Sequence, residues 1–122
     1  MSIEKFMAIF DGLKVAHGYF KIEKTGASGK AQGKAGVLRE PQTKKLWEDH
    51  LSGNGNGLGI IPINEENNCK WGCIDIDQYP LDHKLLVDKI RRMKLPLVVC
   101  RSKSGGAHCF LFTTAWTEAK DM

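Results

Sequence analysis

Hydrophobic side chains recur at helical spacing in three parts of this chain. In residues 2–13 apolar positions fall every three or four residues behind Ser2, a residue type that caps helix N-termini. Residues 41–51 and 80–94 repeat the spacing, and each range begins with a proline, which suits the first helical position. The pattern therefore predicts three amphipathic helices.

Shorter apolar runs predict strands. They cover residues 15–23, 58–63, 69–77, 95–102 and 107–114. The second and third runs are separated by a few polar residues and predict a hairpin, in which Pro62 favours an edge position. We expect the fourth strand to be short and buried, and residues 117–122 to begin a further helix.

From residue 71 onward the predicted order is strand, helix, strand, strand. This order matches the first part of a ferredoxin-like βαββαβ unit. We therefore predict an α+β fold in a single domain of 122 residues. Residues 1–57 would form an N-terminal αβ region, and residues 58–122 an incomplete ferredoxin-like core.

Residues 24–36 are rich in glycine and lysine and offer no apolar face to bury. We predict a flexible basic loop, which either contacts a nucleic-acid backbone or is a plain solvated linker. The loop is not a P-loop, because neither Gly-Lys pair has a glycine at the distance that the GxxxxGK pattern requires.

The composition is that of a soluble globular protein, with 42% hydrophobic and 26% charged residues. A net charge of +4 permits a polyanionic partner without identifying one. The sequence has no apolar run long enough to span a membrane, and its N-terminus lacks the features of a secretory signal. We expect a cytoplasmic protein of a bacterial or phage-infected cell, with no membrane partner.

The four cysteines do not form the CxxC pairs that are typical of zinc sites. On one strand, Cys69 and Cys73 would lie about 13 Å apart, too far to share a metal. Cys109 would point away from the face that its neighbour His108 occupies. Reduced thiols are therefore expected rather than structural zinc.

The stretch "WGCIDIDQY", residues 71–79, carries two acids on an apolar strand. Strand alternation places Asp75 and Asp77 on the side of Cys73, opposite Ile74 and Ile76. Two like charges on one side repel each other, and a divalent cation removes that cost. A solvated edge strand is the alternative interpretation.

The second informative stretch is "RSKSGGAHCFLF", residues 101–112. Cations, hydroxyls and glycines between two apolar strands suit a phosphate cradle, although a basic surface turn would have the same composition. In a ferredoxin-like sheet the first and third strands are neighbours, so Asp75, Asp77 and His108 can meet on one exposed face. Carboxylates for a metal beside cations for a triphosphate are the groups that nucleotidyl transfer needs.

Together, "CIDIDQY" and "RSKSGGAHCFLF" resemble two catalytic motifs of the archaeo-eukaryotic primase superfamily, the primase-polymerases. The upstream "HLSGNGNGLGIIPI" resembles the variant found in primase domains of bacterial conflict systems and phages. The resemblance implies an RRM-like core in which Asp75 and Asp77 bind catalytic Mg²⁺ or Mn²⁺. It implies that the triphosphate is held by Ser104, Gly105, Gly106 and His108, to which we add Arg101 and Lys103.

The resemblance also implies a reaction and its partners. A 3′ hydroxyl would attack the α-phosphate of a nucleoside triphosphate on a single-stranded DNA template. The family has a third acidic motif on a later strand, and Asp121 does not match it. We therefore expect the N-terminal portion of a primase, which alone binds metal weakly and polymerises poorly, and which works with a separately encoded remainder or a helicase.

Three alternatives remain open at this level. The chain could be a nucleotide-binding or single-stranded nucleic-acid-binding module with the same fold and no catalysis. It could be a protein-binding domain whose acids are merely solvated. It could also be a metal-dependent nuclease, since paired carboxylates serve phosphodiester hydrolysis as well.

Overall fold

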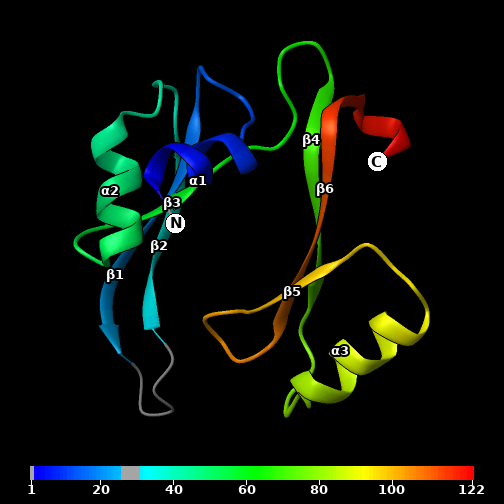
Figure 1. Cartoon of the computed structure of the whole chain (residues 1–122). Coiled ribbons are helices and arrows are strands. Elements are labelled where there is room, and N and C mark those ends of the chain that lie inside the picture. Colours follow the sequence, from blue (N-terminus) through cyan, green and yellow to red (C-terminus); the bar gives the residue numbers. More distant parts are fainter. Residues whose placement is uncertain (1, 26–30) are drawn as a thin grey trace.

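The computed structural model describes residues 2–25 and 31–122, which form two three-stranded antiparallel sheets flanked by helices (Figure 1). The first sheet has the order β2 (Ala31–Leu38), β1 (His17–Thr25), β3 (Gly57–Gly59). The second has the order β4 (Asn68–Ile76), β6 (Ala107–Glu118), β5 (Val98–Arg101). The helices are α1 (Ile3–Ile9), α2 (Lys44–Ser52), α3 (His83–Arg92) and the short 3₁₀ helix η1 (Ala119–Asp121). The predicted α+β class is confirmed.

The three predicted helices are all present, but each is shorter than its sequence pattern. They begin after Ser2, Thr43 and Asp82, whose side-chain oxygens each accept a hydrogen bond from a backbone N–H three residues on. Pro41 and Pro80 precede these caps, so their predicted position inside the first helical turn is wrong. No helix in the described part of the chain is long and apolar enough to cross a membrane.

The predicted hairpin between residues 58–63 and 69–77 is wrong. β3 pairs with β1, and β4 pairs with β6. Gly18 and Gly59 are opposed in the β1–β3 pair, where a Cβ on Gly59 would lie 3.3 Å from the Cα of Gly18. The two glycines thus permit a close backbone approach that joins distant parts of the sequence.

The prediction of a loop over residues 24–36 is wrong where the structure describes it. Residues 31–38 form β2, which pairs with β1 along its length, and residues 26–30 lie outside the described residues. A Cβ on Gly36 would lie 2.6 Å from the hydroxyl of Tyr19, so the tyrosine ring occupies the space above this glycine. A strand built from small residues lacks the apolar alternation by which strands are predicted.

The second half of the chain follows the predicted order β4, α3, β5, β6, with β4 and β6 adjacent. The strand expected to be buried, β5, is instead an edge strand of its sheet, and its residue Val98 is 51% exposed. The helix predicted over residues 117–122 is reduced to η1. β6 continues to Glu118 because Thr117 still pairs with Cys69 of β4.

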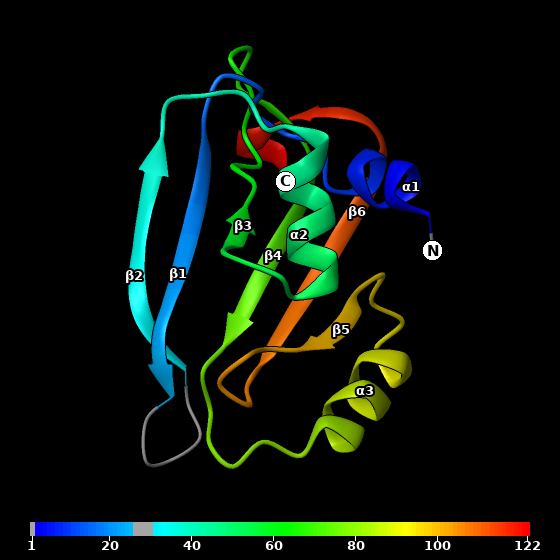
Figure 2. The same cartoon turned by 90° about the vertical axis from the view of Figure 1, so that its left-hand side faces the viewer.

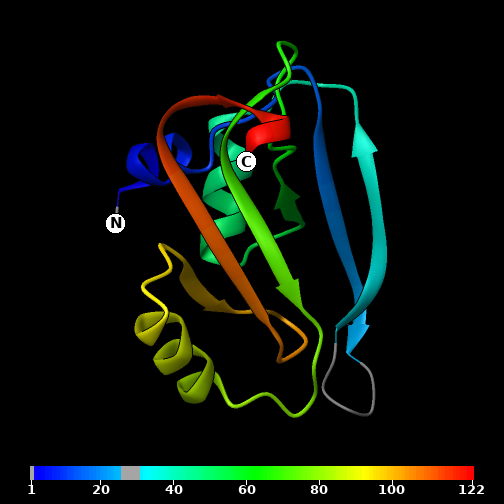
Figure 3. The same ribbon diagram turned by 90° about the vertical axis from the view of Figure 1, so that its right-hand side faces the viewer.

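Aromatic residues pack between the end of α1 and the second sheet. Phe10, the C-cap residue that follows α1, lies 5.3, 5.2 and 5.4 Å, centroid to centroid, from the rings of Trp71, Phe110 and Phe112. The indole N–H of Trp71 donates to the carbonyl of Asp11. Figure 2 shows α1 and α2 in front of β4 and β6, and Figure 3 shows the same strands from the opposite side. The strand face that carries this cluster therefore turns toward the first sheet.

Candidate functional site

Asp75 and His108 lie directly opposite each other on β4 and β6. The imidazole Nε2 is 3.5 Å from the carboxylate Oδ1, and the two side chains are 42% and 58% exposed. Since opposed residues of an antiparallel pair project to the same face, the predicted meeting of the acid and the histidine is observed. Both groups remain accessible to a ligand.

Asp77 follows the last residue of β4 and is connected to the second motif through Tyr79. The Tyr79 hydroxyl donates to the Asp77 carboxylate at 3.2 Å and lies 2.8 Å from the hydroxyl of Ser104. Sequence reasoning missed Tyr79, although it stands two residues after Asp77 and so continues the alternation of the acids. This tyrosine joins the acidic segment to the glycine turn.

The turn between β5 and β6 is closed by its own backbone. The N–H of Ser102 donates to the carbonyl of Gly106, and the N–H of Gly105 donates to the carbonyl of Ser102, each at 3.1 Å. Gly105 has φ +96°, a conformation that favours glycine. A Cβ on Gly106 would collide with the carbonyl oxygen of Ile76 in β4. The turn therefore needs its two glycines for different reasons.

The first residue of α3 also holds this turn. His83 Nε2 lies 2.8 Å from the carbonyl oxygen of Gly106. Because a carbonyl only accepts, Nε2 is the protonated ring nitrogen. Sequence reasoning missed His83 as well, and no local pattern connects it to a glycine located on another element.

The two predicted basic residues do not join Asp75 and His108. Lys103 Nζ lies 3.4 Å above the centroid of the Phe20 ring on β1, a cation–π contact that bridges the two sheets. Arg101 is the exposed last residue of β5. Since Cys100 is opposite His108, strand alternation puts Arg101 on the other face of the sheet.

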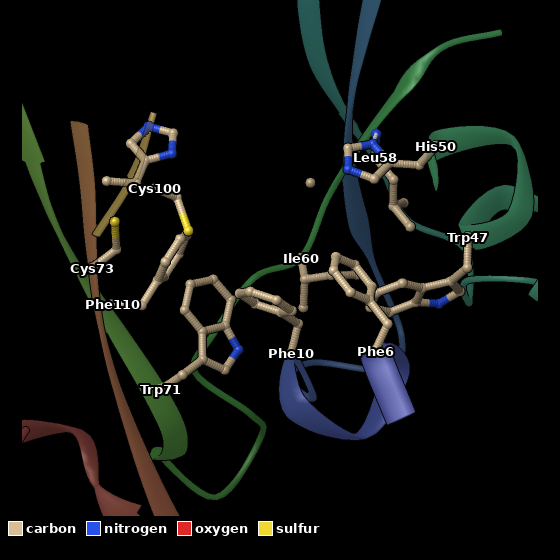
Figure 4. A pocket seen from close by; sticks show the side chains of 12 residues that line it. Phe6, Phe10, Trp47, His50, Leu58, Ile60, Trp71, Cys73, Cys100 and Phe110 are labelled. Carbon is tan, nitrogen blue, oxygen red and sulfur yellow. Dashed lines mark hydrogen bonds between the residues drawn. The ribbon is translucent and has the colours of Figure 1, made fainter. Parts of the chain in front are cut away.

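A cavity of about 530 Å³ adjoins the Asp75–His108 pair (Figure 4). Its lining is mainly aromatic and aliphatic and comes from α1, α2, β3 and the second sheet: Phe6, Phe10, Trp47, His50, Leu58, Gly59, Ile60, Trp71, Cys73, Cys100, His108 and Phe110. Partial burial raises the pKa of the Cys73 thiol, and the charge of Asp75 raises it further. All four cysteines are free; Cys69 and Cys109 are buried, whereas Cys73 and Cys100 are exposed.

Asp75 and Asp77 carry oxygen ligands of the kind that a hard divalent cation prefers, but they do not form a complete metal site by themselves. Magnesium is commonly bound by one or two carboxylates together with water and substrate phosphates. Asp75 and Asp77 supply that number of carboxylates. Within residues 2–25 and 31–122, no group of three or more His, Cys, Asp or Glu side chains is arranged to hold a metal ion. Phosphate oxygens of a substrate would have to complete the coordination.

A comparison with known protein families covers most of the chain. Residues 14–122 match the sequence model of the archaeo-eukaryotic primase domain of the TOTE conflict system. No curated protein matches the chain. The matched range contains β4, the Tyr79 segment and the whole glycine turn.

Proposed function

Since the chain belongs to the archaeo-eukaryotic primase family of the TOTE conflict system, we propose that it contributes to metal-dependent nucleotidyl transfer that makes or extends a primer. The nucleotide would be a nucleoside triphosphate and the template single-stranded DNA. The order β4, α3, β5, β6 and the β4–β6–β5 sheet support an RRM-like core.

In this proposal Asp75 and Asp77 hold Mg²⁺ or Mn²⁺, which would neutralise charge on the phosphates during transfer. Ser104, Gly105 and Gly106 would hold the triphosphate through hydroxyl and backbone N–H groups. His108 would donate a hydrogen bond to a phosphate oxygen. Lys103 would add a positive charge after leaving the Phe20 ring.

The attack of a primer 3′ oxygen would form a bond to the α-phosphorus and break the bond from that phosphorus to the pyrophosphate leaving group. Arg101 is left out of this set because it lies on the other face of the sheet.

The observation that carries the proposal is the pairing of Asp75 with His108 beside the glycine turn. The test is a titration of Mn²⁺ and a labelled nucleoside triphosphate into wild type, Asp75→Ala/Asp77→Ala and Asp88→Ala. Asp88 is an exposed acid of α3 and serves as the matched control. Metal-dependent nucleotide binding should be lost in the double variant and retained in Asp88→Ala. Equal binding by all three proteins would overturn the proposal.

A binding module without catalysis is the second candidate. It is favoured by the presence of two, rather than three, acidic metal donors at the site in the described residues. Incubation of the chain with single-stranded template, Mn²⁺ and nucleotides separates the two functions. Primer synthesis or extension supports catalysis, whereas nucleotide binding without extension or cleavage supports the module.

A further inference from the structure

We propose that the aromatic cavity between α1, α2 and the second sheet binds the purine or pyrimidine base of the nucleotide. This inference rests on the proposed function, because it assigns the base of a ligand whose phosphates lie at the glycine turn. It concerns mainly residues that lie outside the acidic motif of β4 and outside the glycine turn.

The size of the cavity is compatible with a nucleobase. The cavity is open to solvent, since Cys73 and Cys100 in its lining are exposed, and its volume of about 530 Å³ falls within the usual range of small-molecule sites. The side chains that line it converge on this space from separate elements (Figure 4).

The chemistry of the lining suits a flat heteroaromatic ring. Phe10, Trp71 and Phe110 already pack edge to face, so they offer ring faces and edges of fixed orientation. Bases stack on such aromatic side chains with little dependence on sequence. A lining dominated by aromatic rings with few polar groups therefore favours a base over a sugar or a free phosphate.

His50 supplies a polar contact on the opposite wall. Its Nδ1 accepts a hydrogen bond from the N–H of Leu58 at 3.0 Å. In the neutral imidazole the proton is therefore on Nε2, which makes that atom a donor. Ring nitrogens and carbonyl oxygens of bases are the matching acceptors, so His50 is assigned as a base-contacting residue.

The position of the cavity connects it to the phosphate site. His108 belongs to both, because it pairs with Asp75 and also lines the cavity. Cys100, directly opposite His108 on β5, lines the same space. A nucleotide whose phosphates contact His108 can thus place its base in the cavity without crossing the sheet.

The first test uses nucleosides, which carry no phosphate. Adenosine, guanosine, cytidine and uridine are titrated separately into the isotopically labelled chain, and the indole N–H signals are followed by NMR. Trp47 and Trp71 line the cavity and should shift, whereas Trp116 is outside it and should not. Absence of any specific Trp47 or Trp71 shift with all four nucleosides would overturn the inference.

A matched pair of variants tests the same point by filling the cavity. Cys100→Phe should weaken nucleoside binding by about tenfold or more, while Cys100→Ala should leave it near wild type. His50→Ala should weaken it as well. Dispersed amide spectra confirm that each variant is folded. Unchanged nucleoside binding in both Cys100→Phe and His50→Ala would contradict the assignment.

Inorganic tripolyphosphate with Mn²⁺ separates this inference from the proposed function. Its binding should depend on Asp75 and Asp77 and be insensitive to Cys100→Phe. Nucleoside binding should be insensitive to the two acids. If tripolyphosphate fails to bind while nucleosides bind, the proposed phosphate site is wrong and the cavity assignment stands. If tripolyphosphate binds while nucleosides do not, only the cavity assignment is wrong.

Discussion

Gly106 lies so close to the carbonyl oxygen of Ile76 that no side chain fits between the glycine turn and β4. This contact fixes the start of β6, and with it His108, against the end of β4 where the acids lie. The glycine of the second motif thus has a structural task in addition to any contact with a ligand.

Gly106→Ala should therefore destabilise the fold by about 1–3 kcal/mol, because the added methyl group must displace backbone. Gly105→Asn is the matched control, since open space surrounds Gly105 and asparagine tolerates positive φ. Urea unfolding of the two variants measures the difference. A Gly106→Ala protein as stable as wild type would show that the turn does not press on β4.

Removal of the Tyr79 hydroxyl should weaken metal-dependent nucleotide binding several-fold with little effect on stability, about 0.5 kcal/mol or less. Tyr79→Phe keeps the ring but cuts the hydrogen bonds to Asp77 and Ser104. Calorimetric titration of Mn²⁺ and nucleotide measures the loss. Tyr19→Phe, in β1, removes a hydroxyl away from the acids and should bind as wild type does.

His83→Ala should loosen the glycine turn, because the carbonyl of Gly106 loses its side-chain donor. The expected cost is about 1 kcal/mol in the free energy of unfolding, the usual size for one hydrogen bond. Lys84→Ala, at the next and exposed position, should change the stability much less. Faster amide exchange confined to the turn would identify the cause as local. Exchange rates there equal to those of wild type would argue against a restraint from α3.

Much of the site could be predicted from sequence because its geometry follows from strand alternation. Asp75, Cys73 and His108 occupy one face since side chains in a strand alternate, and β4 and β6 are adjacent as the order of elements suggested. Gly105 and Gly106 could be identified from sequence because glycine alone combines a free backbone with the lack of a side chain, and the turn requires both properties.

The rest depended on contacts between distant segments. β2 has no hydrophobic alternation. It pairs with β1 through backbone hydrogen bonds, and the Tyr19 ring of β1 occupies the space above Gly36. β3 pairs with β1 where Gly18 and Gly59 approach each other, a contact between residues that are 41 positions apart in the sequence. Tyr79 and His83 act through partners on other elements, which no local spacing reveals.

Phe10→Ala should lower the free energy of unfolding by about 3 kcal/mol, since it removes the ring that contacts three aromatic side chains of the second sheet. Thermal unfolding followed by circular dichroism measures the effect. Leu51→Ala, in which the deleted side chain is 46% exposed, is the control and should cost far less. Similar losses for both variants would show that the aromatic cluster is not the main contact between α1 and the sheet.

The Cys73 thiol should react with iodoacetamide with a pH midpoint above that of an unperturbed cysteine. Partial burial and the nearby Asp75 charge both raise its pKa, and the reactive form is the thiolate. Mass spectrometry of the modified chain across a pH series gives the midpoint. Asp75→Asn removes one of the causes that raise the pKa, so it should move the midpoint back toward the ordinary cysteine value. A midpoint that stays in place would mean that the carboxylate does not act on this thiol.

The most direct measurement for the whole account is a double-mutant cycle between Asp75→Ala and His108→Ala, read out as Mn²⁺-dependent nucleoside triphosphate binding. If the two residues form one site, the second substitution should cost little once the first is made, with a coupling energy of about 1 kcal/mol or more. Losses that simply add would contradict a shared metal and phosphate site across β4 and β6.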